Sequence, residues 1–451
     1  MKAIIVGMGR SGKCALYALS DLGYDLAVQD SMSPDKADPE IREYCKKHNV
    51  EEFYGTLPED YSSYDQMIIS PGADPEQEFV LKAREQGVEV LGELELAYRL
   101  SRGTFIGITG TNGKTTTTSL TGEIFKASGR KSTVAGNIGI PVVQFAAQST
   151  PEDWMVTEVS SFQLQTVSTF RPKVAAILNL TPDHLNRHHT MENYGLTKAQ
   201  IWKNQTEEDY LILNADDPVL LDLCLAKTGM ERRSRLVLFS RKTDVELGAF
   251  LDGDVLTIRD EEGNDHPLVH RDELKILGDH NVENALAASA IAFFSGIDTD
   301  VICRVLREFP GVEHRLEFVK DIGGVKYYND SKGTNVDATL IALNALKENI
   351  ILIAGGDAKM QDFGFFATKL RGRVKKVLLF GRDRGMIKDA MDAEGYRDYV
   401  ELKNLEECVR YAAEIAVPGD KVLLSPACAS WDMYKDFEVR GRNFKECVNK
   451  L

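Results

Sequence analysis

The stretch FIGITGTNGKTTTT, Phe105 to Thr118, constrains the fold more than any other part of the chain. Its apolar beginning, residues 104–108, predicts a buried strand, and the glycine-rich turn after it leads into a helix that opens with Lys114. Glycines let backbone N–H groups close on phosphate oxygens, and a helix N-terminus adds partial positive charge. We therefore expect a strand–loop–helix unit that binds a triphosphate.

The loop departs from the usual phosphate-loop spacing at one position. A glycine is expected five places before Gly113, but that place is Ile108, with Gly107 and Gly110 on either side. The alternative is an ordinary glycine-rich turn, but the order of strand, GTNGKT and helix favours a nucleotide. Lys114 would reach the β- and γ-phosphates, and the Thr115 hydroxyl would bind Mg²⁺. The predicted nucleotide-binding residues are Gly110, Thr111, Asn112, Gly113, Lys114, Thr115 and Thr116.

Composition bounds the class of protein. The chain has 451 residues, enough for about three domains. Its net charge of −15 argues against a nucleic-acid partner, because a protein that binds the phosphate backbone normally has a basic face. Seven scattered cysteines without a CxxC motif predict reduced thiols rather than disulfides or a zinc site. No apolar run is long enough for a signal peptide or membrane insertion, so we expect a cytoplasmic protein.

The apolar pattern predicts an α/β protein with three domains, 1–101, 102–310 and 311–451. The first begins as a Rossmann-like unit, with strand AIIVG, the turn GMGRSG, a helix and strand LAVQD ending at Asp30. Gly7, Gly9 and Gly12 satisfy GxGxxG, and a second turn, SPG, follows the strand QMII. Both turns are expected at the carboxyl ends of parallel strands, where such sheets bind ligands. A nucleotide or another diphosphate is predicted here; the alternative is that these glycines only allow close helix–strand packing.

The second and third domains also alternate strands and helices. After the phosphate loop we expect strands at 154–159, 174–180 and 210–214, hairpins within 248–269 and a helix at 280–294. Strands at 326–330, 350–355, 376–380 and 421–425 predict a doubly wound C-terminal domain. Pro310 and Gly311 interrupt the helical pattern between the two domains. Mostly parallel sheets covered by helices on both faces are therefore expected.

Two predicted strands beside the phosphate loop end in groups that bind cations. Glu158 lies at the end of 154–159, and an acidic residue there is a natural Mg²⁺ ligand. His184 follows the next strand, and with Asp183 it can hold a divalent cation, including Mn²⁺. The alternatives are a solvated Glu158, and an Asp183 that caps a helix beside a surface His184.

Three further places carry charged groups. Lys198 lies in a predicted helix, where a lysine is usually solvated. The segments NDSKGTN and GGDAKMQDF each follow a strand of the third domain. Arg315, in VEHRLE, lies close to the junction of the second and third domains, and an arginine there is suited to reach a phosphate held by a neighbouring domain.

Taken together, these motifs resemble the ATP-dependent Mur ligases of peptidoglycan synthesis. The resemblance covers the whole chain and rests on GTNGKTT, EVSSFQL, HNVENALAA, EHRLE and NDSKGTN in this order. Within that family, GGDAKMQDF and SPACASWDMYKDFEVRGRNF look like the branch that adds D-glutamate, whereas the string DNPR, typical of relatives that add a diamino acid, is absent. The resemblance implies three domains that bind a UDP-sugar, ATP and an amino acid in chain order.

The resemblance also implies individual roles. The UDP-sugar would contact Gly9, Arg10, Ser11, Asp30, Ser70 and Gly72, and the polar groups on the substrate side would be Asn137 and Gln163. Adenine, ribose and phosphate would be held by Asn281, Asn284, Arg315 and Asp330, and D-glutamate by Lys332, Thr334, Lys359, Ser430 and Phe437. The cation ligands would be Thr115, Glu158, His184 and Lys198, with Lys198 carrying a CO₂-derived carbamate. Lys114, Glu158, His184, Lys198 and Arg315 would be catalytic.

The implied reaction joins D-glutamate to UDP-N-acetylmuramoyl-L-alanine through an acyl phosphate, and we expect a monomer. One alternative is another ligase of the superfamily, either one that adds L-alanine or folylpolyglutamate synthase; the predicted UDP-sugar site argues against the folate enzyme. A second is an NAD-dependent oxidoreductase that uses GMGRSG, which leaves GTNGKTT unexplained. A third is a P-loop ATPase that does mechanical or transport work, which would need no UDP-sugar domain.

Overall fold

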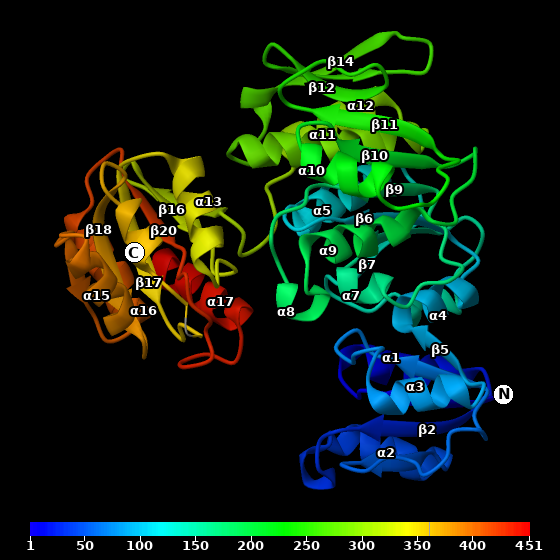
Figure 1. Ribbon diagram of the computed structural model, residues 1–451. Coiled ribbons are helices and arrows are strands. Elements are labelled where there is room, and N and C mark those ends of the chain that lie inside the picture. Colours follow the sequence, from blue (N-terminus) through cyan, green and yellow to red (C-terminus); the bar gives the residue numbers. More distant parts are fainter. Residues whose placement is uncertain (360) are drawn as a thin grey trace. The chain divides into compact units, whose positions relative to one another are not determined.

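The computed structural model describes residues 1–359 and 361–451, and these form three sheets that follow one another along the chain (Figure 1). Most neighbouring strands are parallel, and helices connect them. The predicted α/β class is therefore confirmed.

The first sheet is fully parallel, with the strand order β3-β2-β1-β4-β5. Its strands are β1 (Lys2–Val6), β2 (Asp25–Asp30), β3 (Glu51–Tyr54), β4 (Gln66–Ile69) and β5 (Glu89–Gly92). The helices that accompany it are α1 (Arg10–Asp21), α2 (Pro39–His48) and α3 (Glu78–Glu85). The order places the GMGRSG turn, after β1, beside the SPG turn, after β4, because β1 and β4 are neighbours.

The middle sheet has the order β14-β13-β12-β11-β10-β9-β6-β8-β7. Its parallel part consists of β6 (Thr104–Thr109), β7 (Ser132–Gly136), β8 (Trp154–Glu158), β9 (Val174–Ile177), β10 (Tyr210–Asn214), β11 (Arg235–Ser240) and β12 (Gly248–Asp252). The predicted hairpins are present as the antiparallel strands β12, β13 (Val255–Arg259) and β14 (Asp265–His270). Strand β6 lies between β8 and β9, so the phosphate loop, Glu158 and the segment that leads to His184 emerge at one edge of the sheet.

Helices cover this sheet and fill its connections. They are α4 (Glu93–Leu100), α5 (Lys114–Ala127), α6 (Val143–Ala146), α7 (Ser161–Leu164), α8 (Leu185–His188), α9 (Met191–Ala199), α10 (Pro218–Leu221), α11 (Asp279–Phe294) and α12 (Thr299–Glu308). Short 3₁₀ helices lie at η1 (Pro34–Lys36), η2 (Gln200–Trp202) and η4 (Arg271–Glu273), and η3 (Asp222–Ala226) is a π-helical turn.

The third sheet has the order β15-β16-β20-β17-β18-β19 and is parallel except for the edge strand β15. Its strands are β15 (Glu317–Ile322), β16 (Val325–Asn329), β17 (Ile350–Gly355), β18 (Val374–Phe380), β19 (Tyr399–Glu401) and β20 (Lys421–Leu424). Its helices are α13 (Val336–Leu346), α14 (Gly364–Thr368), α15 (Arg384–Ala393), α16 (Leu405–Ile415) and α17 (Phe437–Asn449).

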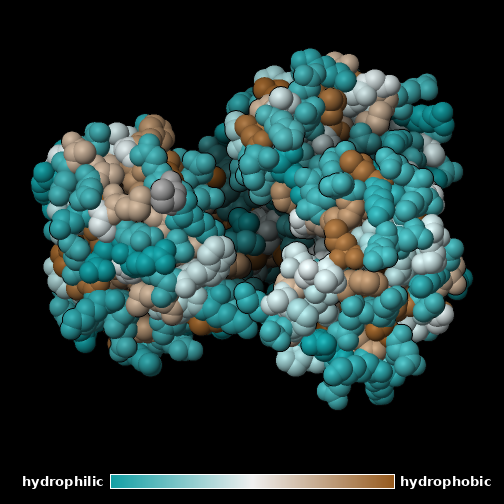
Figure 2. Space-filling model, turned by 60° about the horizontal axis from the view of Figure 1, so that its bottom comes forward, coloured by the Kyte–Doolittle hydropathy of each residue, from teal (hydrophilic) through white to brown (hydrophobic). Residues whose placement is uncertain are grey.

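The chain divides into two compact units. The first contains residues 1–273 and 283–307, and therefore both the first and the middle sheet; the second contains residues 274–282 and 308–451. On the face shown in Figure 2, hydrophilic residues predominate and hydrophobic ones form small, separate patches. Among the described residues, none of the helices combines the length and the apolarity that crossing a membrane requires.

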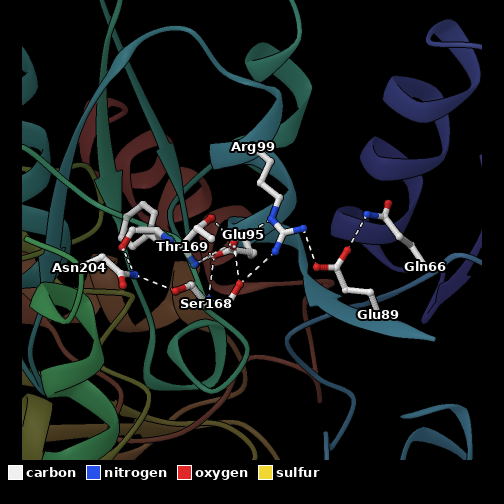
Figure 3. Close-up of polar contacts among 8 residues, drawn as sticks. Gln66, Glu89, Glu95, Arg99, Ser168, Thr169 and Asn204 are labelled. Atoms are coloured by element: carbon white, nitrogen blue, oxygen red, sulfur yellow. Dashed lines mark hydrogen bonds and ion pairs between the residues drawn. The ribbon is translucent and has the colours of Figure 1, made fainter. Parts of the chain in front are cut away.

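Helix α4 joins the first sheet to the middle sheet through a buried carboxylate (Figure 3). Glu95 is fully buried and accepts hydrogen bonds from the backbone N–H groups of Ser168, Thr169 and Phe170, each at 3.0 Å. Arg99 donates to Glu95 at 2.9 Å and to Glu89 of β5 at 2.8 Å. Burial by itself would raise the pKa of Glu95, but the hydrogen bonds outweigh burial and hold the pKa at about 2.

Candidate functional site

The phosphate loop has the conformation that its sequence predicts. Gly113 adopts a φ of +82°, and a Cβ atom there would lie 2.2 Å from Asn284 Oδ1, so only glycine fits. Lys114 opens α5 and folds back over the loop, where Nζ donates to the carbonyl oxygens of Gly110 and Thr111, both at 2.8 Å. Its ammonium group therefore lies over the backbone that would surround a phosphate.

Two asparagines brace this loop. The side chain of Asn179 accepts from Asn112 N at 2.8 Å and donates to Asn112 O at 3.1 Å. Asn284, on α11, accepts from Thr117 Oγ1 at 3.2 Å. Asn179 was not among the predicted site residues, although a polar residue near the end of the predicted strand 174–180 was an available signal. Asn281 belongs to the second unit, where its amide donates to Leu277 O at 2.7 Å.

Glu158 is buried at the end of β8, and only one of its two carboxylate oxygens accepts a hydrogen bond from the described residues. Its Oε1 accepts from Asn137 Nδ2 at 2.7 Å. Its Oε2 is also buried, yet it accepts no hydrogen bond from the described residues. Because a buried carboxylate oxygen without a partner is costly, this arrangement fits a cation ligand. A solvated Glu158 is excluded by its exposed fraction of 2%.

His184 lies at the mouth of the same edge. It has a left-handed φ of +52°, its side chain is half-exposed, and its ring packs against Phe162. Its Nε2 lies 3.4 Å from Asp183 Oδ2. Asp183 accepts from His184 N at 2.9 Å and does not cap α8, so the helix-capping alternative is wrong. The accessible imidazole and the adjacent carboxylate suit a divalent cation.

Lys198 is the least expected member of the site. It is 1% exposed, and Nζ donates to Gly110 O at 3.0 Å and to Thr109 Oγ1 at 3.3 Å. Burial, followed by the positive charge of Lys114, lowers the pKa of Lys198 well below its ordinary value, against the opposing charges of Asp183 and Glu158. The interpretation of Lys198 as a solvated helical lysine is therefore wrong.

Tyr194 forms part of this environment and was also missed by the sequence analysis. Lys198 Nζ lies 4.7 Å from the centre of the Tyr194 ring. The Tyr194 hydroxyl is 3.2 Å from Thr111 Oγ1 of the phosphate loop. The two residues are four positions apart on α9 and therefore share one helix face. This spacing could have indicated from the sequence that Tyr194 lies beside Lys198.

A second part of the site is a cavity of about 840 Å³ between the first sheet and the middle sheet. It lies within the first unit and is bordered by the turns after β1 and β4. All the residues predicted to contact a UDP-sugar or to lie on its substrate side line this cavity: Gly9, Arg10, Ser11, Asp30, Ser70, Gly72, Asn137 and Gln163. Its size suits a ligand larger than a simple metabolite.

Close approach explains the glycines of the GxGxxG turn. A Cβ atom at Gly12 would lie 2.0 Å from the carbonyl oxygen of Gly7, so α1 can start against the turn only with glycine there. Asp30 accepts from Met8 N at 2.6 Å and from Met32 N at 2.9 Å, which fixes the turn from the next strand. Gly12 therefore does allow close packing of α1, as the alternative proposed. The same turn also borders the cavity through Gly7 and Gly9.

Arg10 connects the cavity to the middle domain, because it donates to Gly139 O at 2.9 Å. Asn137 belongs to the same segment, and through its bond to Glu158 it lies between the cavity and the cation-binding edge. A direct side-chain contact therefore links the cavity to Glu158, at the end of the strand next to β6.

The second unit holds the remaining predicted residues, most of them on loops of the third sheet, whereas Phe437 opens α17. Asp330 is buried, accepts from Ser425 Oγ at 2.7 Å and from Leu316 N at 3.1 Å, and burial raises its pKa to about 6. Lys332 Nζ lies 5.6 Å from the centre of the Phe437 ring, and Lys359 Nζ lies 4.2 Å from that of Trp431. Ser430 is buried and Thr334 half-buried. Arg315 also belongs to this unit.

Arg440, which the sequence analysis did not single out, supports these loops. Its fully buried guanidinium group donates to Ser331 Oγ, Ser331 O and Cys428 O at 3.0, 2.8 and 3.1 Å. It therefore ties the loop that carries Lys332 to the loop that carries Ser430.

Comparisons with known proteins cover the whole chain. Family profiles match residues 1–92 as a Mur ligase MurD-like N-terminal domain, residues 108–292 as a Mur ligase middle domain and residues 314–428 as a Mur ligase glutamate ligase domain. UDP-N-acetylmuramoylalanine–D-glutamate ligases are similar over the full chain and 98% of their own length. The one from Alkaliphilus metalliredigens is 44% identical, and the one from Caldanaerobacter subterraneus subsp. tengcongensis is 46% identical.

Solved structures share the fold. UDP-N-acetylmuramate–alanine ligase from Thermotoga maritima aligns with a TM-score of 0.61 and 21% identity, covering 100% of this chain and 99% of its own. A pseudomurein peptide ligase from Methanothermus fervidus aligns with a TM-score of 0.56 and 19% identity over the same shares of the two chains.

Proposed function

The chain belongs to the Mur ligase family, and we propose that it joins D-glutamate to UDP-N-acetylmuramoyl-L-alanine while ATP is converted to ADP and phosphate. The observation that carries this proposal is the position of Asn137. It lines the cavity of the first unit and also donates to Glu158 beside the phosphate loop. A sugar nucleotide in the cavity could thus extend its acyl end toward ATP. The alternative of an NAD-dependent oxidoreductase does not explain the phosphate loop GTNGKTT.

The chain's own residues would act mainly by orientation and charge. Lys114 over the loop would neutralise phosphate charge, so that an anionic carboxylate can attack the γ-phosphorus and release ADP. The amine of D-glutamate would then attack the acyl carbon of the mixed anhydride, lose a proton and expel phosphate. Thr115, Glu158 and His184 would hold Mg²⁺ or Mn²⁺, which supplies further positive charge near the reacting oxygens.

Lys198 would carry a carbamate. Burial and the charge of Lys114 lower the pKa of Lys198 and so favour its neutral form, and a neutral amine can attack CO₂ and lose a proton to give a carbamate anion. This anion would face the cation-binding edge formed with Glu158 and so turn a repulsive side chain into a ligand. The loss of the Lys198 positive charge also removes its repulsion with Lys114.

The amino acid would bind in the second unit. Lys332 and Lys359 offer positive charges for the carboxylates of D-glutamate, and Thr334, Ser430 and Phe437 complete the predicted pocket. Asn281, Asn284, Arg315 and Asp330 are proposed to contact the nucleotide. The alternative is a relative that adds another amino acid.

Phosphate release from ATP, measured with and without each substrate, tests the proposal. We expect turnover only when UDP-N-acetylmuramoyl-L-alanine and D-glutamate are both present. Better turnover with L-alanine or a diamino acid would contradict the choice of D-glutamate. Turnover without any amino acid would favour a simple ATPase. A cytoplasmic location and a monomeric state are part of the proposal; fractionation and light scattering check them.

A further inference from the structure

We infer that Glu93 is a positioning residue, which orients the amide of Gln163 so that an N–H group faces the cavity of the first unit. The inference rests on the proposed function, because it assigns that cavity to the sugar nucleotide. Glu93 is the first residue of α4 and lies two positions before Glu95, the carboxylate that anchors the same helix.

Glu93 lies behind the cavity wall rather than in it. It is 2% exposed and is not among the residues that line the cavity. Its Oε1 accepts from Val143 N at 2.9 Å, at the start of α6, and its Oε2 accepts from Gln163 Nε2 at 3.4 Å. Both oxygens thus face N–H donors that belong to the middle domain.

These contacts decide which way round the Gln163 amide lies. Gln163 Oε1 accepts from Ser160 N at 2.9 Å and from Ser160 Oγ at 3.0 Å. A backbone N–H can only donate, and Glu93 Oε2 is the acceptor that Gln163 Nε2 meets. The Ser160 N–H therefore selects the oxygen of the amide, and Glu93 selects the nitrogen.

The orientation has a consequence for the ligand. An amide nitrogen carries two hydrogens, and Glu93 takes one of them. The oxygen of Gln163 is used by Ser160, so the group available to a molecule in the cavity is the second N–H. The structure thus assigns to this wall a donor for a carbonyl, carboxylate or phosphate oxygen of the sugar nucleotide.

The same carboxylate also supports the adjoining wall. The segment before α6 contains Asn137, Gly139 and Pro141, all of which line the cavity. Val143 N donates to Glu93, so one carboxylate contacts both the start of α6 and the Gln163 amide; we expect the Gln163 contact to account for the effect on KM and the Val143 contact to act on stability.

The test uses Glu93→Gln with Glu95→Gln as the matched control. The first change places an NH₂ group against Val143 N–H or Gln163 Nε2 and should raise the KM for UDP-N-acetylmuramoyl-L-alanine about tenfold. We expect kcat and the KM values for ATP and D-glutamate to stay within about twofold. Glu95→Gln removes a buried carboxylate of the same helix that lies away from the cavity, so it should lower Tm without changing that KM.

A double-mutant cycle separates positioning from stability. If Glu93 acts through Gln163, Glu93→Gln should add less than about twofold to the KM of Gln163→Ala. A full tenfold addition in that background, or a Glu93→Gln enzyme with the wild-type KM, would overturn the inference. Glu93→Asp keeps the carboxylate, should give an intermediate KM, and serves as the second variant if Glu93→Gln does not fold. An inactive wild-type chain would instead refute the proposed function.

Discussion

Replacement of Glu95 by glutamine should weaken the first unit by about 3 kcal/mol at pH 7. The pKa of Glu95 is about 2 in the folded chain, compared with an ordinary value of 4.5. By linkage, this difference corresponds to about 3 kcal/mol of unfolding free energy when the group is ionised in both states. Glutamine keeps one acceptor oxygen but turns an NH₂ group toward the N–H groups of residues 168–170.

The sign of the pH dependence follows from the lowered pKa. The stabilisation by Glu95 is fully present above its unfolded pKa and is lost as pH falls from about 4.5 through about 2. At pH 3 about half of it should remain, so the difference between wild type and Glu95→Gln should shrink to between 1 and 2 kcal/mol, on the order of the remaining linkage.

Urea unfolding followed by tryptophan fluorescence measures this difference, since Trp154 and Trp202 both lie in the first unit. The matched control is Glu89→Gln, at the half-exposed end of the same network (Figure 3), which should cost less than about 1 kcal/mol. A loss below about 1 kcal/mol for Glu95→Gln, or a loss that is the same at pH 7 and pH 3, would refute the reasoning.

Three further predictions concern the proposed site. Lys114→Ala should abolish measurable turnover and change Tm by only a few degrees, since Nζ donates to two carbonyl oxygens of the loop that would hold phosphate; near-normal turnover in a folded variant would refute the phosphate-loop assignment. Lys198→Ala should be severely impaired and partly restored by small carboxylic acids, and Lys198→Arg should stay inactive, because arginine keeps its charge; ¹³C-labelled bicarbonate should give a carbamate carbon signal in the wild type alone, and an active Lys198→Arg would argue against the carbamate. Asp330 has a pKa raised to about 6, so its ionisation destabilises the second unit as pH rises from about 4 to about 6. Asp330→Asn should therefore stabilise that unit by about 3 kcal/mol at pH 7 while weakening ATP binding, and calorimetry that shows a lower unfolding temperature would contradict this.

Most of the strands, their parallel arrangement and the phosphate loop could be predicted from the sequence because each has a local cause. Buried parallel strands appear as short apolar runs, and the loop needs particular glycines within a few positions of one another. Six strands were not predicted, and all of them except β11 lie at the edge of a sheet: β3, β5, β7, β11, β15 and β19.

The site residues also differ in whether the sequence alone could place them. Lys114 and Glu158 follow strands of one sheet, so the sequence alone placed them at one edge. The burial of Lys198 could not be inferred from its helix, because the groups that accept from its Nζ belong to Thr109 and Gly110, about 90 positions earlier in the chain. Only the tertiary structure brings these groups together and lowers the pKa of the lysine.

The sequence by itself determined the fold class and the phosphate loop, whereas the tertiary structure decided which polar groups are buried and what they contact. Asn281 and Asn284 are one helical turn apart, yet they belong to different compact units. Glu93 and Glu95 look alike in GELELAYRL, but one contacts Gln163 at the cavity wall and the other anchors α4 on residues 168–170. Such differences arise because the partners lie about 50 to 75 positions away in the chain, where no local pattern can record them.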